Sequence, residues 1–158
     1  MRRFTESLYA ISITLWIGGL WIVGFLVAPT LFSQVPERTL AGMLAGKLFN
    51  AMSWIGLSCA TYLLLFTLLR QGAAACKSSV FWLVFSLLAL TALSLFGITP
   101  IIAQLKAGTV SHEWVTDLMS SITRDRFAVW HGIASVLYVL QSVLGLLLVV
   151  TTGRRQRF

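Results

Sequence analysis

Charged residues are scarce in this sequence. They make up 11% of its 158 residues, with 12 Lys and Arg against 5 Asp and Glu, whereas 58% of the residues are hydrophobic. A soluble domain carries about 25% charged residues, because water must wet the surface that covers its core. The shortage of charge therefore excludes an ordinary water-soluble domain and predicts that lipid contacts much of the surface.

Two further features exclude other classes of protein. The chain has only two cysteines, of which Cys59 lies in an apolar stretch and Cys76 in a connection, so we expect two free thiols rather than a disulfide. The net charge is +7, but the basic residues sit at chain ends and in short connections instead of on one polar face. We therefore predict no nucleic-acid partner.

Charge is absent altogether from four long windows, residues 7–36, 48–69, 78–105 and 127–153. Each window exceeds the roughly 20 residues that a helix needs to cross a bilayer. The strands of a closed barrel would alternate apolar and polar residues at about ten-residue spacing, and the run 144–150 does not alternate. The sequence predicts an all-α protein, a polytopic membrane four-helix bundle.

We expect a single membrane domain, residues 1–158, with spans at about 6–28, 48–70, 80–98 and 127–152. Pro29 and Pro100 are expected to end the first and third helices, because the residue before a proline is disfavoured in the α region. Gly72 and Gly153 follow the second and fourth spans, where glycine commonly ends a helix.

The distribution of Lys and Arg predicts the orientation. The termini and the middle connection, which lie on one side, carry Arg2, Arg3, Arg70, Lys77, Arg154, Arg155 and Arg157. The other side carries five basic residues together with four of the five acids. Because basic residues close to the membrane favour the cytoplasm, both termini are predicted to be cytoplasmic (N-in/C-in), in a bacterial inner membrane.

We expect short interfacial helices on the external side. The first begins at Pro36, because proline suits the first turn of a helix. Its small residues at four-residue spacing are Ala41, Gly42, Ala45 and Gly46. The alternative is that this segment forms the first turns of a long, tilted second helix. In the second external segment, Trp114, Leu118 and Ile122 recur every four residues and predict an amphipathic helix on the membrane.

Polar side chains recur on one face of the fourth span. They are His131, Ser135, Tyr138 and Ser142, followed by Gly145. Thr14 and Gly18 in the first span and Asn50 in the second add further polar or small positions. Because polar groups are costly in lipid, we expect this polar seam to face the bundle interior or a partner helix.

Apart from Glu6 and Arg70 at the span ends, His131 is the only histidine, lysine, arginine or acid that we place inside a predicted span. A functional His131 would ligate haem or copper, or carry protons. A structural His131 would donate one hydrogen bond between helices and stay neutral. Metal sites need several convergent ligands, and no recognisable ligand spacing accompanies this residue, so no metal site is predicted.

Basic residues also gather near the external ends of the second and fourth spans. Lys47, Arg124 and Arg126 are candidate contacts for an anion or a lipid headgroup. The alternative is that these long side chains simply reach the interface. We find no nucleophile–base pair, phosphate loop or paired intramembrane carboxylates, so no catalytic residue is predicted and an enzyme is not indicated.

Several short blocks resemble a known family. The early blocks are residues 15–19 (LWIGG), 28–32 (APTLF), 41–42 and 46–49, and the later ones are 98–100 and 126–132. Together they resemble the transmembrane-protein-205-like family of bacterial domains of unknown function, which implies four membrane helices without an established activity. A more distant likeness links the first helix to HemJ-type and CopD-type membrane proteins. HemJ-type proteins look to use a first-helix histidine for haem, where this sequence has none.

The sequence thus favours a non-enzymatic accessory or interaction protein that engages the lipid bilayer, a membrane-protein partner or a second copy of itself. One alternative is a haem- or copper-binding redox protein that uses His131. The other is a small-solute carrier built around the polar seam.

Overall fold

The computed structural model describes residues 2–102, 104 and 117–155. Within these residues the chain is helical and contains no strand. The first long helix is α1 (Arg2–Trp21), η1 (Ile22–Val27) and α2 (Ala28–Gln34), and the second is α3 (Arg38–Gln71). After the short η2 (Gly72–Lys77), α4 (Ser79–Ala92) and η3 (Leu93–Ile98) form the third, and α6 (Asp117–Arg155) is the fourth.

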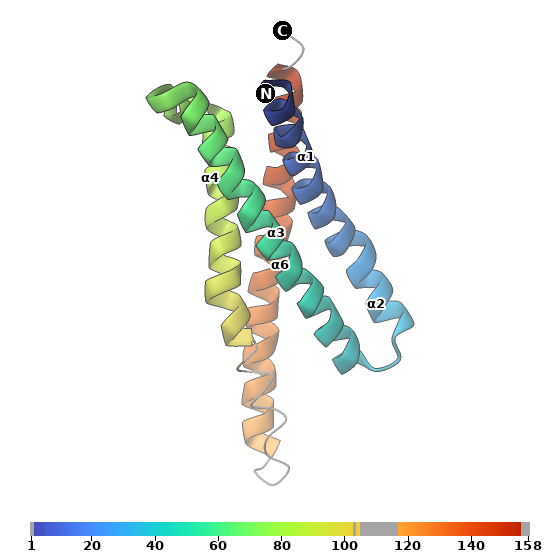
Figure 1. Ribbon diagram of the computed structural model, residues 1–158. Coiled ribbons are helices and arrows are strands. Elements are labelled where there is room, and N and C mark those ends of the chain that lie inside the picture. Colours follow the sequence, from blue (N-terminus) through green and yellow to red (C-terminus); the bar gives the residue numbers. More distant parts are fainter. Residues whose placement is uncertain (1, 103, 105–116, 156–158) are drawn as a thin grey trace.

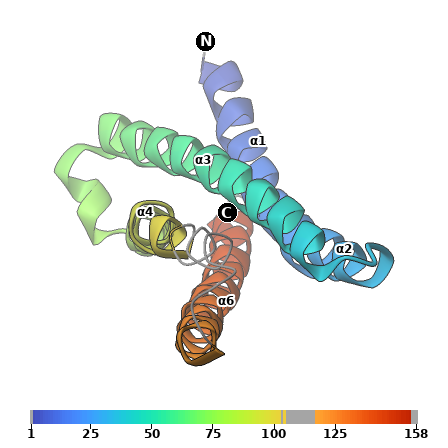
Figure 2. The same cartoon turned by 90° about the horizontal axis from the view of Figure 1, so that it is seen from below.

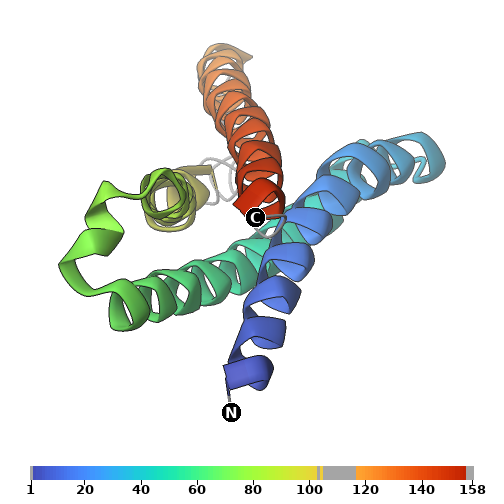
Figure 3. The same ribbon diagram turned by 90° about the horizontal axis from the view of Figure 1, so that it is seen from above.

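The four long helices alternate in direction. Both termini and η2 lie at one end of the molecule, whereas the connection between α2 and α3 lies at the other (Figure 1). Helix α3 contacts α1 and α4, and α6 contacts α4 and α1, so the helices form a closed ring in the order α1, α3, α4, α6. Figures 2 and 3 show this ring from its two ends.

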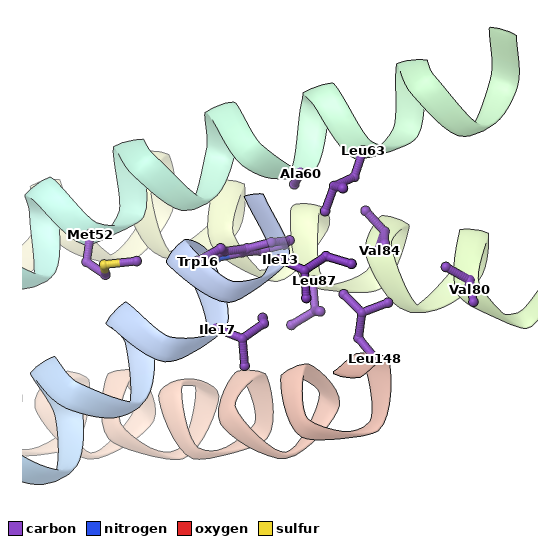
Figure 4. Close-up of a cluster of buried hydrophobic side chains, with 10 residues drawn as sticks. All are labelled: Ile13, Trp16, Ile17, Met52, Ala60, Leu63, Val80, Val84, Leu87 and Leu148. Atoms are coloured by element: carbon purple, nitrogen blue, oxygen red, sulfur yellow. The ribbon is translucent and has the colours of Figure 1, made fainter. Parts of the chain in front are cut away.

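A single apolar cluster fills the middle of the ring (Figure 4). Trp16, Leu63, Leu87 and Leu148 come from four different helices, and each has less than 2% of its surface exposed. The other members of the cluster are Ile13, Ile17, Met52, Ala60, Val80 and Val84. All four long helices therefore share one core.

Large apolar side chains also cover the outside of the bundle. Leu26, Leu69, Phe96 and Val136, one on each long helix, are more than 60% exposed. Exposure of such side chains to water would cost about 25 cal/mol of free energy for each Å² of apolar surface. A surface this apolar therefore marks contact with lipid or protein. Among the described residues, four helices are long and apolar enough to cross a membrane, which confirms an all-helical fold with four candidate membrane spans.

The first and third helices do not end at their prolines, and this expectation was wrong. The first helix continues through Pro29 to Gln34, and the third continues through Pro100 to Ile102. A proline normally breaks a helix because it lacks an N–H group and its ring meets the carbonyl four residues earlier. Here each proline follows six residues of π-helix, whose wider turns accommodate such a change in the hydrogen-bond ladder.

A threonine beside each proline donates its hydroxyl to a carbonyl of its own helix. The Thr30 hydroxyl donates to the Leu26 carbonyl at 2.6 Å, and the Thr99 hydroxyl donates to the Ser94 carbonyl at 2.9 Å. The carbonyls that lose a proline donor lie four or five residues before Pro29 and Pro100, so these bonds satisfy the threonine hydroxyls and do not replace the missing backbone bonds.

The second helix is also longer than expected. It begins at Arg38, so the separate interfacial helix after Pro36 is absent and the alternative, a long second helix, is observed. Ala41 and Ala45 in its first turns are buried, which gives this segment tertiary contacts of its own. Lys47 consequently lies nine residues after Arg38, inside the helix rather than at its start.

The fourth helix likewise exceeds its predicted span. It begins at Asp117 and passes Gly153 to end at Arg155. Leu118 and Ile122 therefore belong to a helix that is continuous with the membrane span. Trp114 and the rest of the predicted amphipathic segment before Asp117 lie outside the described residues.

Candidate functional site

The bundle encloses only part of the predicted polar seam. Ser142 is 1% exposed, while Tyr138 and Asn50 are half-buried. The Ser142 hydroxyl donates to the Tyr138 carbonyl at 2.9 Å, and the carbonyl of Ser142 accepts the indole N–H of Trp21 at 3.3 Å. These residues form an internal polar contact between α6 and α1.

The remaining seam residues face outward. Thr14, His131 and Ser135 are exposed, and a side chain added at Gly18 would meet no atom within 4 Å in the part of the chain that the structure describes. The hydroxyls of Thr14 and Ser135 donate to the carbonyls four residues earlier on their own helices. Such bonds lower the cost of an outward-facing hydroxyl in lipid.

The described residues contain no group of three or more His, Cys, Asp or Glu side chains that could hold a metal ion. Cys59 and Cys76 are free thiols. Haem or copper ligation by His131 and a solute-carrier role for the seam both stay predictions.

Tyr138 makes the most specific contact in the bundle interior. Its hydroxyl donates to the carbonyl of Leu20, and the backbone N–H of Gly24 donates to the same hydroxyl. Leu20 and Gly24 are four residues apart, so they would bond directly to each other in an α-helix. The tyrosine from α6 therefore takes a place in the hydrogen-bond ladder of the first helix, where η1 begins.

Gly24 permits this approach because it has no side chain. A Cβ at Gly24 would lie 2.2 Å from Cε1 of Tyr138, a separation that atoms in contact do not reach. The ring of Phe49 on α3 meets the Tyr138 ring edge-on at 4.9 Å. Three helices thus fix the tyrosine, and the sequence pattern indicated only that Tyr138 belongs to a polar face.

A pocket of about 560 Å³ opens at the end of the bundle that holds both termini. Residues from all four long helices line it, together with Ser78 just before α4. They are Glu6, Tyr9, Phe66, Thr67, Arg70, Gln71, Ser78, Val80 and Thr152. Volumes of this size are typical of small-ligand pockets. The lining combines aromatic and aliphatic side chains with hydroxyls, an amide and an ion pair.

The ion pair joins α1 to α3 across the pocket mouth. Nη2 of Arg70 lies 3.0 Å from Oε1 of Glu6, and both side chains remain almost half exposed. The Arg70 guanidinium also lies 5.8 Å from the centre of the Phe66 ring, which in turn packs against Tyr9 at 5.2 Å. Exposed pairs of this kind contribute about 0–1 kcal/mol, so stability alone gives a weak account of the pair.

The hydroxyls of the pocket differ in whether they have a hydrogen-bond partner. Oγ1 of Thr67 donates to the Leu63 carbonyl at 2.7 Å. Oγ1 of Thr152 is buried, and within the described part of the chain it has no hydrogen-bond partner. A buried hydroxyl without a partner costs about 1–3 kcal/mol, which makes Thr152 a position where a bound molecule or water would be stabilised.

The sequence pattern did not indicate this pocket. Arg70 and Glu6 lie 64 positions apart, and no motif or spacing in the sequence links them. The predicted external group of Lys47, Arg124 and Arg126 stays a prediction. Lys47 and Arg126 are exposed, no contact between them is observed among the described residues, and the side chain of Arg124 lies outside that part.

Comparison with known proteins identifies the family. A protein-family model described as a domain of unknown function, DUF4149, matches residues 11–111, which is more than half of the chain. The chain belongs to this family. No curated protein and no solved structure matches the DUF4149 chain. The match ends before α6, so Tyr138, Ser142 and Thr152 lie outside the region that defines the family.

Proposed function

We propose that this DUF4149 protein is a non-enzymatic accessory protein of the bacterial inner membrane. It binds another membrane protein, or a second copy of itself, through uncovered helix faces, while lipid covers the rest of its surface. The observation that carries this proposal is on α3. Ala41 and Ala45 are buried within the bundle, whereas side chains added at the adjacent Gly42 and Gly46 would meet no atom of the described residues within 4 Å.

The chemistry of these positions suits a helix as the partner. In lipid, small residues let two helix backbones approach closely, which strengthens their van der Waals contact. Gly42 and Gly46 are one turn apart and therefore share a face. Gly18 and Thr14 on α1 offer a second open surface of the same kind.

The orientation belongs to the same proposal. Both termini and η2 lie at one end (Figure 1), and the basic residues of that end favour the cytoplasm. The likeness to the transmembrane-protein-205-like family agrees with four spans and supplies no activity to carry over. The distant likeness to HemJ-type and CopD-type proteins stays a prediction.

Cysteine crosslinking tests the proposed interface. In a background with Cys59→Ser and Cys76→Ser, Gly42→Cys and Gly46→Cys should give a defined dimer or heteromeric product in native membranes. Leu65→Cys is the control, because Leu65 is 54% exposed on the same helix but points to a different face. Equal crosslinking at all three positions, or none at Gly42 and Gly46, would contradict the proposal.

A further inference from the structure

We propose that the pocket at the terminal end of the bundle binds the headgroup of an anionic phospholipid. The proposal is independent of the accessory role, because the pocket lies inside the ring of helices and Gly42 and Gly46 do not line it. It names one ligand chemistry, a phosphate monoanion joined to an apolar chain.

The walls of the pocket fit an amphiphile. Tyr9, Phe66 and Val80 provide an apolar surface, while Thr67, Ser78 and Thr152 provide hydroxyls. The pocket lies near the ends of four helices that are long and apolar enough to span a membrane, so in a bilayer it would be close to the headgroups. A phosphate or glycerol oxygen at this depth would supply the hydrogen bond that Oγ1 of Thr152 lacks within the described residues.

Positive charge favours a headgroup with a net negative charge over a zwitterionic one, because the basic side chains at this end repel the ammonium group that accompanies the phosphate in phosphatidylcholine. The Arg70 guanidinium has five N–H donors, and its observed bond to Glu6 uses Nη2. Guanidinium groups bind phosphate with two parallel hydrogen bonds, which a compact ammonium group cannot do. Lys77 at the end of η2 and Arg154 in the last turn of α6 are exposed at the same end of the bundle.

Substitution of Glu6 distinguishes a lipid-binding site from a purely structural ion pair. Its carboxylate competes with a phosphate for the Arg70 guanidinium and repels an anion at the pocket mouth. Glu6→Gln should therefore tighten lipid binding, whereas Arg70→Met should weaken it. A purely structural ion pair predicts the opposite pattern, in which both substitutions loosen the pocket and weaken any binding.

Native mass spectrometry of the full chain, extracted in mild detergent, measures binding of phosphatidylglycerol and phosphatidylcholine. The unsubstituted protein should prefer phosphatidylglycerol. Arg70→Met should weaken its binding about tenfold and Thr152→Val about threefold, as expected for the loss of a charged and a neutral hydrogen bond. Thr151→Val is the matched control, because the Thr151 hydroxyl is already bonded to the Leu147 carbonyl at 2.7 Å, and it should leave binding unchanged.

Inorganic phosphate distinguishes the two sources of the headgroup chemistry. A lipid site should keep its phosphatidylglycerol in millimolar phosphate, because the apolar wall holds the acyl chains. Displacement of the lipid by phosphate alone would overturn the lipid assignment in favour of a free-anion site. Equal binding of both lipids, or unchanged binding in both Arg70→Met and Thr152→Val, would overturn the anion site itself.

Thermal unfolding of each variant separates binding from folding. Thr152→Val should be at least as stable as the unsubstituted protein, because it removes an unsatisfied buried hydroxyl. A loss of stability in this variant would show that the hydroxyl is satisfied without lipid and would count against the site. Failure of crosslinking at Gly42 and Gly46 would leave this lipid-binding result unchanged.

Discussion

At the scale of single residues, Tyr138 and Gly24 connect two helices through the backbone. The hydroxyl of Tyr138 bonds to both Leu20 and Gly24, whose backbone groups would otherwise pair with each other. A side chain inserted into a helical ladder is one of the recognised causes of a local change in helix geometry. Here the insertion coincides with the start of the π-helical segment η1.

Removal of this hydroxyl should destabilise the bundle. Tyr138→Phe keeps the ring against Phe49 but removes the hydrogen bond to the Leu20 carbonyl that joins α6 to the first helix. We expect a loss of about 1–3 kcal/mol in the free energy of unfolding, measured by reversible denaturation in mixed micelles. Tyr62→Phe is the control, because the Tyr62 hydroxyl is exposed and its bond to Thr5 is long at 3.4 Å. Equal losses in both variants would contradict a special role for Tyr138.

Glycine substitutions should separate positions that need close approach from those that do not. Gly24→Ala places a Cβ 2.2 Å from the Tyr138 ring, so we expect a loss of about 1–3 kcal/mol from overpacking. Gly18→Ala meets open space and should change stability by less than about 1 kcal/mol. The same denaturation measurement compares them. Similar values for the two variants would show that Tyr138 can move aside freely.

At the scale of elements, two of the four helices use the same device. Pro29 and Pro100 each follow a π-helical segment and each has a neighbouring threonine whose hydroxyl bonds to a preceding carbonyl. The prolines therefore sit inside continuous membrane helices instead of ending them. Position along the chain alone could not indicate this, because a proline usually marks a helix boundary.

Helix α3 has two neighbouring faces that should respond differently to added volume. Ala45 is 4% exposed, whereas Gly46 beside it has open space. Ala45→Leu should therefore lower the free energy of unfolding by about 1–3 kcal/mol through overpacking, and Gly46→Leu should leave it nearly unchanged. Denaturation of the isolated protein tests both.

In native membranes, added volume at Gly46 should also disturb the proposed contact with a partner helix. Gly46→Leu should reduce formation of the crosslinked product at Gly42→Cys, because the larger side chain blocks close helix approach. A stable Gly46→Leu protein that crosslinks normally would separate this face from the partner interface.

At the scale of the whole molecule, the alternating helices place the termini and η2 at one end. Cys76 in η2 is exposed, whereas Cys59 in α3 is half-buried. A membrane-impermeant maleimide should therefore label Cys76 in inverted inner-membrane vesicles but not in intact spheroplasts.

Two controls make the labelling decisive. Cys76→Ser should abolish the signal, because Cys59 lies in an apolar span that the reagent does not enter. Maleimide labelling from the periplasmic side instead would reverse the predicted orientation while leaving the fold untouched.

Part of this architecture could be predicted from the sequence. Four uncharged windows fixed the number and approximate position of the helices, because long apolar runs are stable only where hydrocarbon surrounds them. The helix ends at Pro29, Pro100 and Leu48 were wrong. The first and third helices pass their prolines after π-helical segments, and the burial of Ala41 and Ala45 gives the start of α3 tertiary contacts that the charge pattern does not show.

The sequence by itself determined that this is a four-helix protein with an apolar surface, since that follows from the spacing of its charges. Only the tertiary structure decided which polar residues face inward. Helical periodicity groups Ser135, Tyr138 and Ser142 on one side of α6, but the rotation of that helix against α1 buries Ser142 and leaves Ser135 outside. The same rotation brings Thr152 into the pocket that Glu6 and Arg70 also line, because residues distant in the chain meet only when helices dock.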